Sequence, residues 1–145
     1  MFRFLQYGNI LLRHRCLAVK ELSPRVKEIT ENMLEVGRVT DCYGIASPQM
    51  GKCLEIVYLN TELLELDSDL EVLYNLDVRF IGGKVKEIEG CLSLPNKVEV
   101  SRSETICVSA RNLLFKKVEF ECSGLLSRVI QHEFDHLRGI LIIDY

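Results

Sequence analysis

The sequence has 145 residues, of which 48% are hydrophobic and 27% are charged, as in an ordinary globular protein. This length predicts one compact domain over residues 1–145 rather than two. The formal net charge of −3 supplies no basic field for nucleic acid, and the longest uncharged stretches are far too short to span a membrane. We therefore expect neither nucleic-acid specificity nor membrane insertion, and a substrate that is held by local chemistry.

Six cysteines are present, and none forms a CxxC pair. No secretory signal is visible, because arginines and Tyr7-Gly8-Asn9 interrupt any apolar core. We therefore expect reduced thiols and a cytoplasmic, bacterial-type location. Organelle targeting stays open, since residues 1–19 carry three arginines and no acidic residue. Four thiols are expected to be small buried apolar side chains: Cys16, Cys53, Cys107 and Cys122.

The first predicted element is a helix over residues 24–36. Ser23 is a suitable N-cap, Pro24 takes the first helical position, and Gly37 is expected to end the helix. A loop over residues 43–51 follows. β-branched or alternating apolar residues then predict strands over residues 53–59, 70–79, 98–102, 105–110 and 117–122.

The last predicted element is a helix over residues 125–137. Ser123 or Gly124 lies near its start, and Gly139 lies just past its end. Strands that precede and surround a carboxy-terminal helix favour an α+β fold over a parallel βαβ fold.

The strongest local motif is His132-Glu133-Phe134-Asp135-His136. Residues four apart share one helix face, so the two histidines can offer their imidazoles to one metal, and Glu133 can reach a water on it. The alternative is a pair of surface histidines. The sequence has only three histidines, so a chance HExxH should occur in well under ~1% of such sequences. Leu125 and Val129 continue the same face as an apolar wall.

A catalytic metal site with an open position needs a third protein ligand. Downstream, only Asp144 has a suitable side chain, and it lies beyond Gly139. The third ligand is therefore expected upstream, and Cys91 in the tight segment Glu89-Gly90-Cys91 is the best candidate. A lone thiol of this kind is more often buried and structural. His14 is another conceivable ligand, but nothing around it indicates a site.

Three segments together resemble the signature motifs of peptide deformylases, in order and with family-like separations. They are Gly44-Ile45-Ala46-Ser47-Pro48-Gln49, Glu89-Gly90-Cys91-Leu92-Ser93 and Gln131-His132-Glu133-Phe134-Asp135-His136. The resemblance covers nearly the whole chain. It implies a metal-dependent hydrolase that removes the N-formyl group from the starting methionine of nascent polypeptides and releases formate. It also implies a compact domain of antiparallel strands packed around the HExxH helix, with a further helix near the amino terminus.

The resemblance implies one divalent metal ion per chain, with Cys91, His132 and His136 as ligands and water in the fourth position. Fe(II) is the implied physiological ion, and zinc, nickel or cobalt can occupy such a site. Glu133 is the implied proton-transfer group; the alternative is a carboxylate on the helix surface. By resemblance, the Gln49 amide and the Leu92 backbone N–H stabilise the developing oxyanion. The alternative for Gln49 is an amide that only ties its loop down.

The implied partners are N-formylmethionyl nascent peptides, with transient ribosome association. Tyr43, Leu125 and Val129 map to the methionine pocket of the family, although ordinary packing is the competing interpretation. The peptide backbone is expected to pair in an extended form beside Gly44-Ile45 and Gly90.

Glu89 and Arg102 are interpreted either as an ion pair that holds the Cys91 segment or as two unrelated charges. The sequence departs from the family at Cys42, where a glycine is usual. This places a second thiol near the metal, and a simple loop variation is the favoured explanation. Three rival functions remain at this stage: a non-catalytic relative, a small metallopeptidase and a structural metal module.

Overall fold

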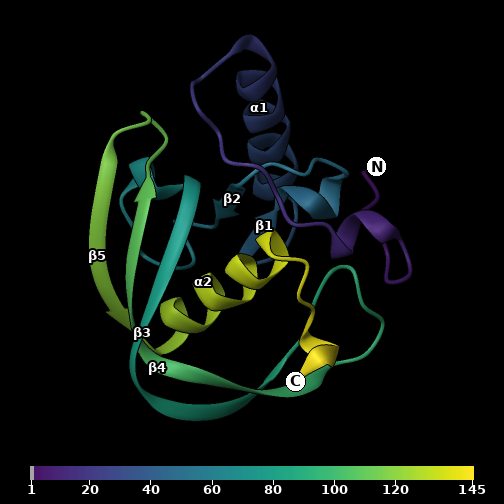
Figure 1. Ribbon diagram of the computed structural model, residues 1–145, viewed down its shortest axis with the longest axis vertical. Coiled ribbons are helices and arrows are strands. Elements are labelled where there is room, and N and C mark those ends of the chain that lie inside the picture. Colours follow the sequence, from purple (N-terminus) through teal and green to yellow (C-terminus); the bar gives the residue numbers. More distant parts are fainter. Residues whose placement is uncertain (1) are drawn as a thin grey trace.

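The computed structural model describes residues 2–145, and it confirms the predicted α+β fold (Figure 1). Two α-helices and five strands make up the regular structure. They are α1 (Pro24–Val39), β1 (Gly44–Ala46), β2 (Ile56–Leu59), β3 (Val72–Glu89), β4 (Val98–Arg111), β5 (Lys117–Ser123) and α2 (Gly124–Leu137). None of the helices in the described part of the chain is long and apolar enough to cross a membrane.

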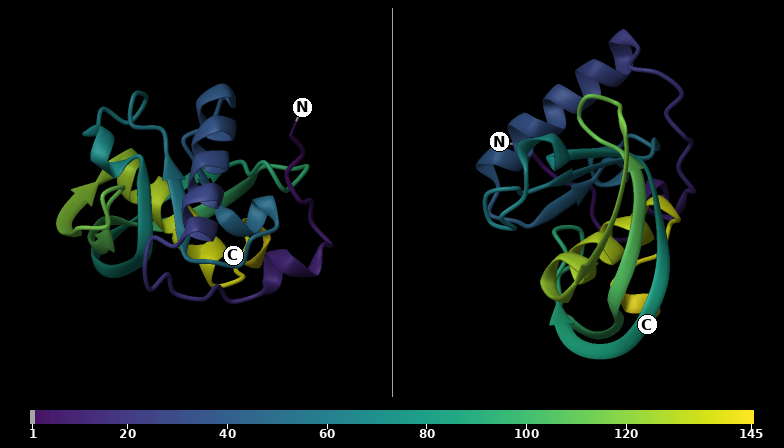
Figure 2. Two further views of the ribbon diagram at one scale, coloured as in Figure 1. Left: turned by 90° about the horizontal axis from the view of Figure 1, so that it is seen from above. Right: turned by 90° about the vertical axis from the view of Figure 1, so that its left-hand side faces the viewer.

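The five strands form one antiparallel sheet in the order β1-β2-β3-β4-β5. Its β1–β3 part has a helix on each face, which explains why β2 is buried throughout. Ile56 and Tyr58 of β2 pack in the cluster that contains α1, whereas Val57 and Leu59 pack in the cluster that contains α2. This division follows from the alternation of side chains along a strand. The long strands β3 and β4 curve around α2, so that the helix lies within the bend (Figure 2).

The expected start of α1 is confirmed, but its expected end is wrong. The Ser23 hydroxyl accepts a hydrogen bond from the Val26 N–H, as predicted for an N-cap. The helix then continues past Gly37 to Val39. Gly37 lies against the ring of Tyr58, where an added Cβ would come within 2.5 Å of the ring. This glycine therefore permits close packing of α1 on the sheet and does not end the helix.

The two long strands differ most from the expectation. β3 runs on to Glu89 through Gly82 and Gly83, and β4 is unbroken where two strands were predicted. A register shift between Phe80 and Gly82 accommodates the glycines, as a β-bulge does. The Ser103 hydroxyl, in the expected gap in β4, donates to the carbonyl oxygen of Gly82 across the pair. The hairpin therefore stays continuous and carries residue 89 to the middle of α2.

Gly139 follows α2, as predicted, and it provides a test of the fold. Its φ is +75°, and an added Cβ would lie 2.4 Å from the carbonyl oxygen of Arg13. Because both the backbone conformation and the contact oppose a side chain, we expect Gly139→Ala to lower the free energy of unfolding by about 2–4 kcal/mol. Urea denaturation would measure this loss. Gly82→Ala is the matched control, since nothing lies within 4 Å of its added Cβ. Equal losses in the two variants would contradict the packing argument.

Candidate metal centre and active site

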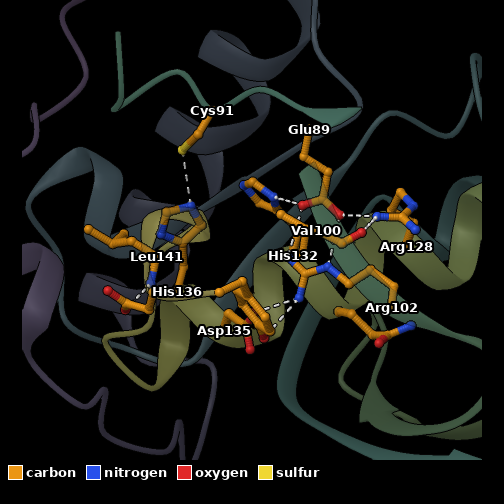
Figure 3. Close-up of polar contacts among 12 residues, drawn as sticks. Glu89, Cys91, Val100, Arg102, Arg128, His132, Asp135, His136 and Leu141 are labelled. Atoms are coloured by element: carbon orange, nitrogen blue, oxygen red, sulfur yellow. Dashed lines mark hydrogen bonds and ion pairs between the residues drawn. The ribbon is translucent and has the colours of Figure 1, made fainter. Parts of the chain in front are cut away.

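Cys91, His132 and His136 bring three ligand atoms together at one point of the fold. The two histidines lie one turn apart on α2, and Cys91 follows the end of β3. The Cys91 Sγ lies 3.4 Å from the His136 Nε2 (Figure 3). All three ligand atoms lie within 4.8 Å of one another. The upstream thiol is thus the third ligand, as expected, while His14 is exposed and Asp144 pairs with Arg13 at 2.6 Å.

The donor set fits a divalent transition-metal ion. The His132 Nδ1 lies 2.9 Å from the Glu89 Oε1, which leaves Nε2 as the ligand atom on that ring. A carboxylate behind a ligating histidine fixes the tautomer and the ring orientation. One thiolate and two imidazoles also match the ligands of catalytic zinc sites, which keep a fourth position open. The metal site predicted from the sequence is therefore present.

Glu89 belongs to a buried network of charges between the sheet and α2. Arg102 donates from Nε and Nη2 to the two Glu89 carboxylate oxygens at 2.8 Å, and from Nη1 to Asp135 at 2.6 Å. Tyr145 completes the network by donating from its hydroxyl to Asp135 at 2.6 Å. Burial opposes ionisation of Glu89, but hydrogen bonds from Arg102 and His132 outweigh it and lower its pKa to about 2. The ion pair between Glu89 and Arg102 is confirmed. The direct contact between Glu89 and His132 was not predicted.

Glu133 lies inside the protein beside the ligands. Its side chain is 4% exposed, and its Oε1 has no hydrogen-bond partner among the described residues. Burial raises the pKa of Glu133 to about 7, against the opposing charges of His132 and Arg102. Gly44 faces this carboxylate, and a Cβ there would lie 3.1 Å from the Glu133 Oε2. The interpretation of Glu133 as an ordinary surface carboxylate is therefore wrong.

Gln49 is buried at the same site, and its two ends have different partners. Its Oε1 accepts a hydrogen bond from the Ala46 N–H at 3.0 Å. Its Nε2 donates to the Ser93 Oγ at 3.2 Å and lies 3.7 Å from the Cys91 Sγ. The carbonyl end thus ties down its own loop, while the amino end points to the metal site. Both interpretations of this residue have support in the geometry.

The amino-terminal segment braces the two segments that carry Gln49 and Leu92, a role that was not expected from the sequence. The Leu5 N–H donates to the carbonyl oxygen of Gln49 at 2.8 Å, and the Tyr7 N–H donates to that of Ser93 at 2.8 Å. Between them, the Gln6 Nε2 donates to the carbonyl oxygen of Leu92 at 3.1 Å. Three consecutive residues therefore fix the spacing between the two loops.

A cavity of about 440 Å³ opens beside the metal ligands. Five of the six residues predicted to bind substrate line this cavity: Tyr43, Gly44, Gly90, Leu125 and Val129. The sixth, Ile45, turns its fully buried side chain into the α1 cluster. The backbone of Ile45 lies in β1, which is an edge strand of the sheet. Ile45 could therefore contact the substrate through its backbone but not through its side chain.

The cavity wall also contains residues that were not expected there from the sequence, notably Ile88 and Arg128. Arg128 lies three residues after Leu125 and four before His132, so helical spacing alone could have placed it on this face. Cys42 lines the same wall but lies outside the three-ligand group. Burial, followed by the charge of Glu133, raises the pKa of the Cys42 thiol to about 11.

A cysteine and an HExxH pair around a cavity, with a buried glutamate beside them, define a metal-dependent hydrolase. The model of the polypeptide deformylase family matches residues 1–145. A peptide deformylase of Dictyoglomus turgidum is 34% identical, with 94% of this chain and 87% of that relative covered. One of Buchnera aphidicola is 36% identical, with 100% of this chain and 83% of the relative covered. The crystal structure of peptide deformylase from Thermotoga maritima superposes with a TM-score of 0.87 at 34% identity, covering 99% of this chain and 96% of that one.

The chain therefore belongs to the polypeptide deformylase family. It is a metal-dependent hydrolase that removes the N-formyl group from nascent peptides, and Cys91, His132 and His136 form its metal site. The predictions of family, fold, enzyme class and metal ligands are confirmed.

The contact between Glu89 and His132 leads to a prediction about metal affinity. Glu89→Gln keeps the size of the side chain but removes the charge that orients His132. We expect the affinity for Co(II) or Ni(II) to fall by about 10–100-fold, the usual effect of losing such a partner. Competition with a chromophoric chelator would measure it. Glu87→Gln, on the same strand but exposed, is the matched control. Equal affinities in the two variants would remove Glu89 from this role.

Proposed function

We propose that Glu133 carries the proton transfers of deformylation, and that Gln49 and Leu92 stabilise the charge that develops on the formyl oxygen. The observation that supports this most directly is the buried Glu133 carboxylate, which has an unpartnered oxygen beside the three-ligand group. A divalent ion held by those ligands supplies Lewis acidity, which lowers the pKa of water and polarises a carbonyl.

A single residue, Glu133, can carry both proton transfers of the reaction. Glu133 accepts a proton from the attacking water and delivers it to the amide nitrogen as the C–N bond breaks. The products are the free amino terminus of the peptide and formic acid, which ionises to formate while the amine takes up a proton. Because the Glu133 side chain is enclosed by the fold and faces Gly44, it is held where it can serve both transfers without a large movement.

The oxyanion donors come from the two braced loops. The Gln49 Nε2 and the Leu92 N–H belong to segments whose spacing is fixed by hydrogen bonds from Leu5, Gln6 and Tyr7. Preorganised donors of this kind stabilise a transition state without reorganisation during the reaction. The Ser93 hydroxyl accepts one hydrogen bond from Gln49 and so orients its amino group.

The substrate is proposed to be an N-formylmethionyl peptide. Tyr43, Leu125 and Val129 line the cavity beside the ligands, where they would contact the methionine side chain. The backbone of Gly44-Ile45 and that of Gly90 would pair with the extended peptide, a mode that depends little on downstream side chains. A non-catalytic relative, the first rival, would have no need for a buried Glu133 and Gln49 beside the three ligands.

We propose Fe(II) as the working metal, with zinc, nickel or cobalt able to occupy the same mixed thiolate and imidazole site. Affinity in such sites rises from Fe(II) toward nickel, so the ion that is found after purification depends on supply. All six cysteines are free, which fits a reducing compartment such as the cytoplasm. Nascent peptides would be met there through transient association with the ribosome.

Glu133→Ala tests the proton-transfer role. We expect formate release from a formyl-methionyl peptide to fall by about 100- to 10,000-fold, because general acid–base catalysis is removed. The assay would use protein reconstituted anaerobically with Fe(II) or with Ni(II). Metal content is the control, since the variant keeps all three ligands. A variant that holds metal and releases formate at the parental rate would exclude Glu133 from the reaction.

Two substitutions at Gln49 separate its two roles. Gln49→Ala removes both ends of the amide, and we expect kcat to fall by at least about 100-fold, as for the loss of an oxyanion donor. Gln49→Glu keeps an acceptor for the Ala46 N–H but removes the amino donor, so it should be slow as well. Steady-state kinetics would be compared with thermal unfolding of the same samples. If Gln49→Glu restored turnover, the amide would be structural only.

A further inference from the structure

Arg128 places a positive charge in the wall of the substrate cavity. It lies on the same face of α2 as Leu125 and His132, and it lines the cavity beside the metal ligands. A second cavity of about 320 Å³ shares three lining residues with it: Ile88, Leu125 and Arg128. These three residues therefore form the boundary at which the substrate cavity ends.

The guanidinium of Arg128 is held rigidly. Its Nη1 donates to the Glu89 Oε2 at 2.5 Å and to the Val100 carbonyl oxygen at 3.0 Å (Figure 3). Its Nη2 donates to the Val85 carbonyl oxygen at 2.6 Å. The side chain is only 13% exposed. Because β3 and β4 both fix it, the group cannot swing out of the wall when a ligand enters.

The contacts formed by Arg128 within the described residues leave part of its donor capacity unused. A guanidinium has five N–H donors, and three of them are accounted for by Glu89, Val100 and Val85. One Nη2 hydrogen and the Nε hydrogen remain. An apolar ligand pressed against them would bury donors without partners, at a cost in binding, whereas a ligand with an acceptor would satisfy one of them.

The two residues that accompany Arg128 at this boundary are apolar and exposed. The side chains of Ile88 and Leu125 are 69% and 49% exposed, although both are large and hydrophobic. A complementary side chain is therefore apolar along its length, with a hydrogen-bond acceptor at its end. The thioether of methionine is a weak acceptor. Its sulfoxide has the same skeleton and a strong acceptor oxygen, and norleucine has no acceptor at all.

We infer that Arg128 determines the specificity for the first side chain, and that the enzyme also deformylates peptides that begin with methionine sulfoxide. The sulfoxide oxygen accepts a charge-assisted hydrogen bond from the guanidinium, which is stronger than a neutral one. This inference rests on the proposed placement of the substrate side chain in the cavity. It adds a substrate class: formylated nascent chains whose starting methionine is already oxidised.

The test compares three formyl tripeptides that differ only in the first side chain: methionine, methionine sulfoxide or norleucine. The ratio of kcat/KM for the sulfoxide peptide to that for the norleucine peptide is measured in the parent protein and in Arg128→Met. Since both substrates are assayed on the same sample, differences in metal loading and in general activity cancel. We expect a ratio of about 10 or more in the parent, as for one charge-assisted hydrogen bond, and at least a tenfold fall in Arg128→Met.

Arg25→Met, at an exposed position on α1, is the matched control and should keep the parental ratio. An unchanged ratio in Arg128→Met would overturn the inference, because a purely structural arginine affects both substrates equally. If that variant does not fold, the parent alone decides, since a preference for norleucine over the sulfoxide also overturns it. A metal-loaded parent that releases formate from none of the three peptides would instead defeat the proposed function.

Discussion

The carboxylate of Glu89 is the point on which the rest of the site depends. It ends β3 and accepts hydrogen bonds from Arg102 and Arg128, and it contacts the metal ligand His132. Burying one charge alone would be prohibitive, and buried ion pairs often add little net stability. Removing one partner of such a pair is nevertheless costly, about 3–5 kcal/mol. The network therefore acts mainly as a constraint on geometry, since the sheet and α2 can meet in few ways that satisfy every charge.

That constraint explains how ligands far apart in the sequence reach one ion. β3 and β4 bend around α2 (Figure 2), and the end of β3 arrives opposite the middle of the helix. Glu89 is the last residue of the strand and turns inward to His132, while Cys91, two residues later, has left the strand and reaches His136. The same chain segment thus orients one ligand and supplies another.

The sequence predicts those parts of the structure that local spacing controls. The two histidines are four residues apart on one helix and Glu133 directly follows the first of them, so their relation needed no tertiary information. The continuity of β3 through Gly82 and Gly83 was missed, because glycines usually interrupt a strand, and here cross-strand pairing with β4 overrides that tendency. Gly37 was misread for a similar reason, since only the position of the Tyr58 ring shows that it serves packing.

Arg128 was missed for a different physical reason. A charged residue on a helix is normally read as solvent-exposed, and only the folded structure reveals that Glu89 and two strand carbonyls hold it inside the wall. Its attachment to Glu89 has a further consequence. Arg128 lines the cavity and donates to the same Glu89 carboxylate that contacts His132, so a change at position 128 also alters the support of this metal ligand. Under the role proposed for Arg128, pocket specificity and metal geometry are coupled, and a substitution that alters one without the other must preserve the positive charge beside Glu89.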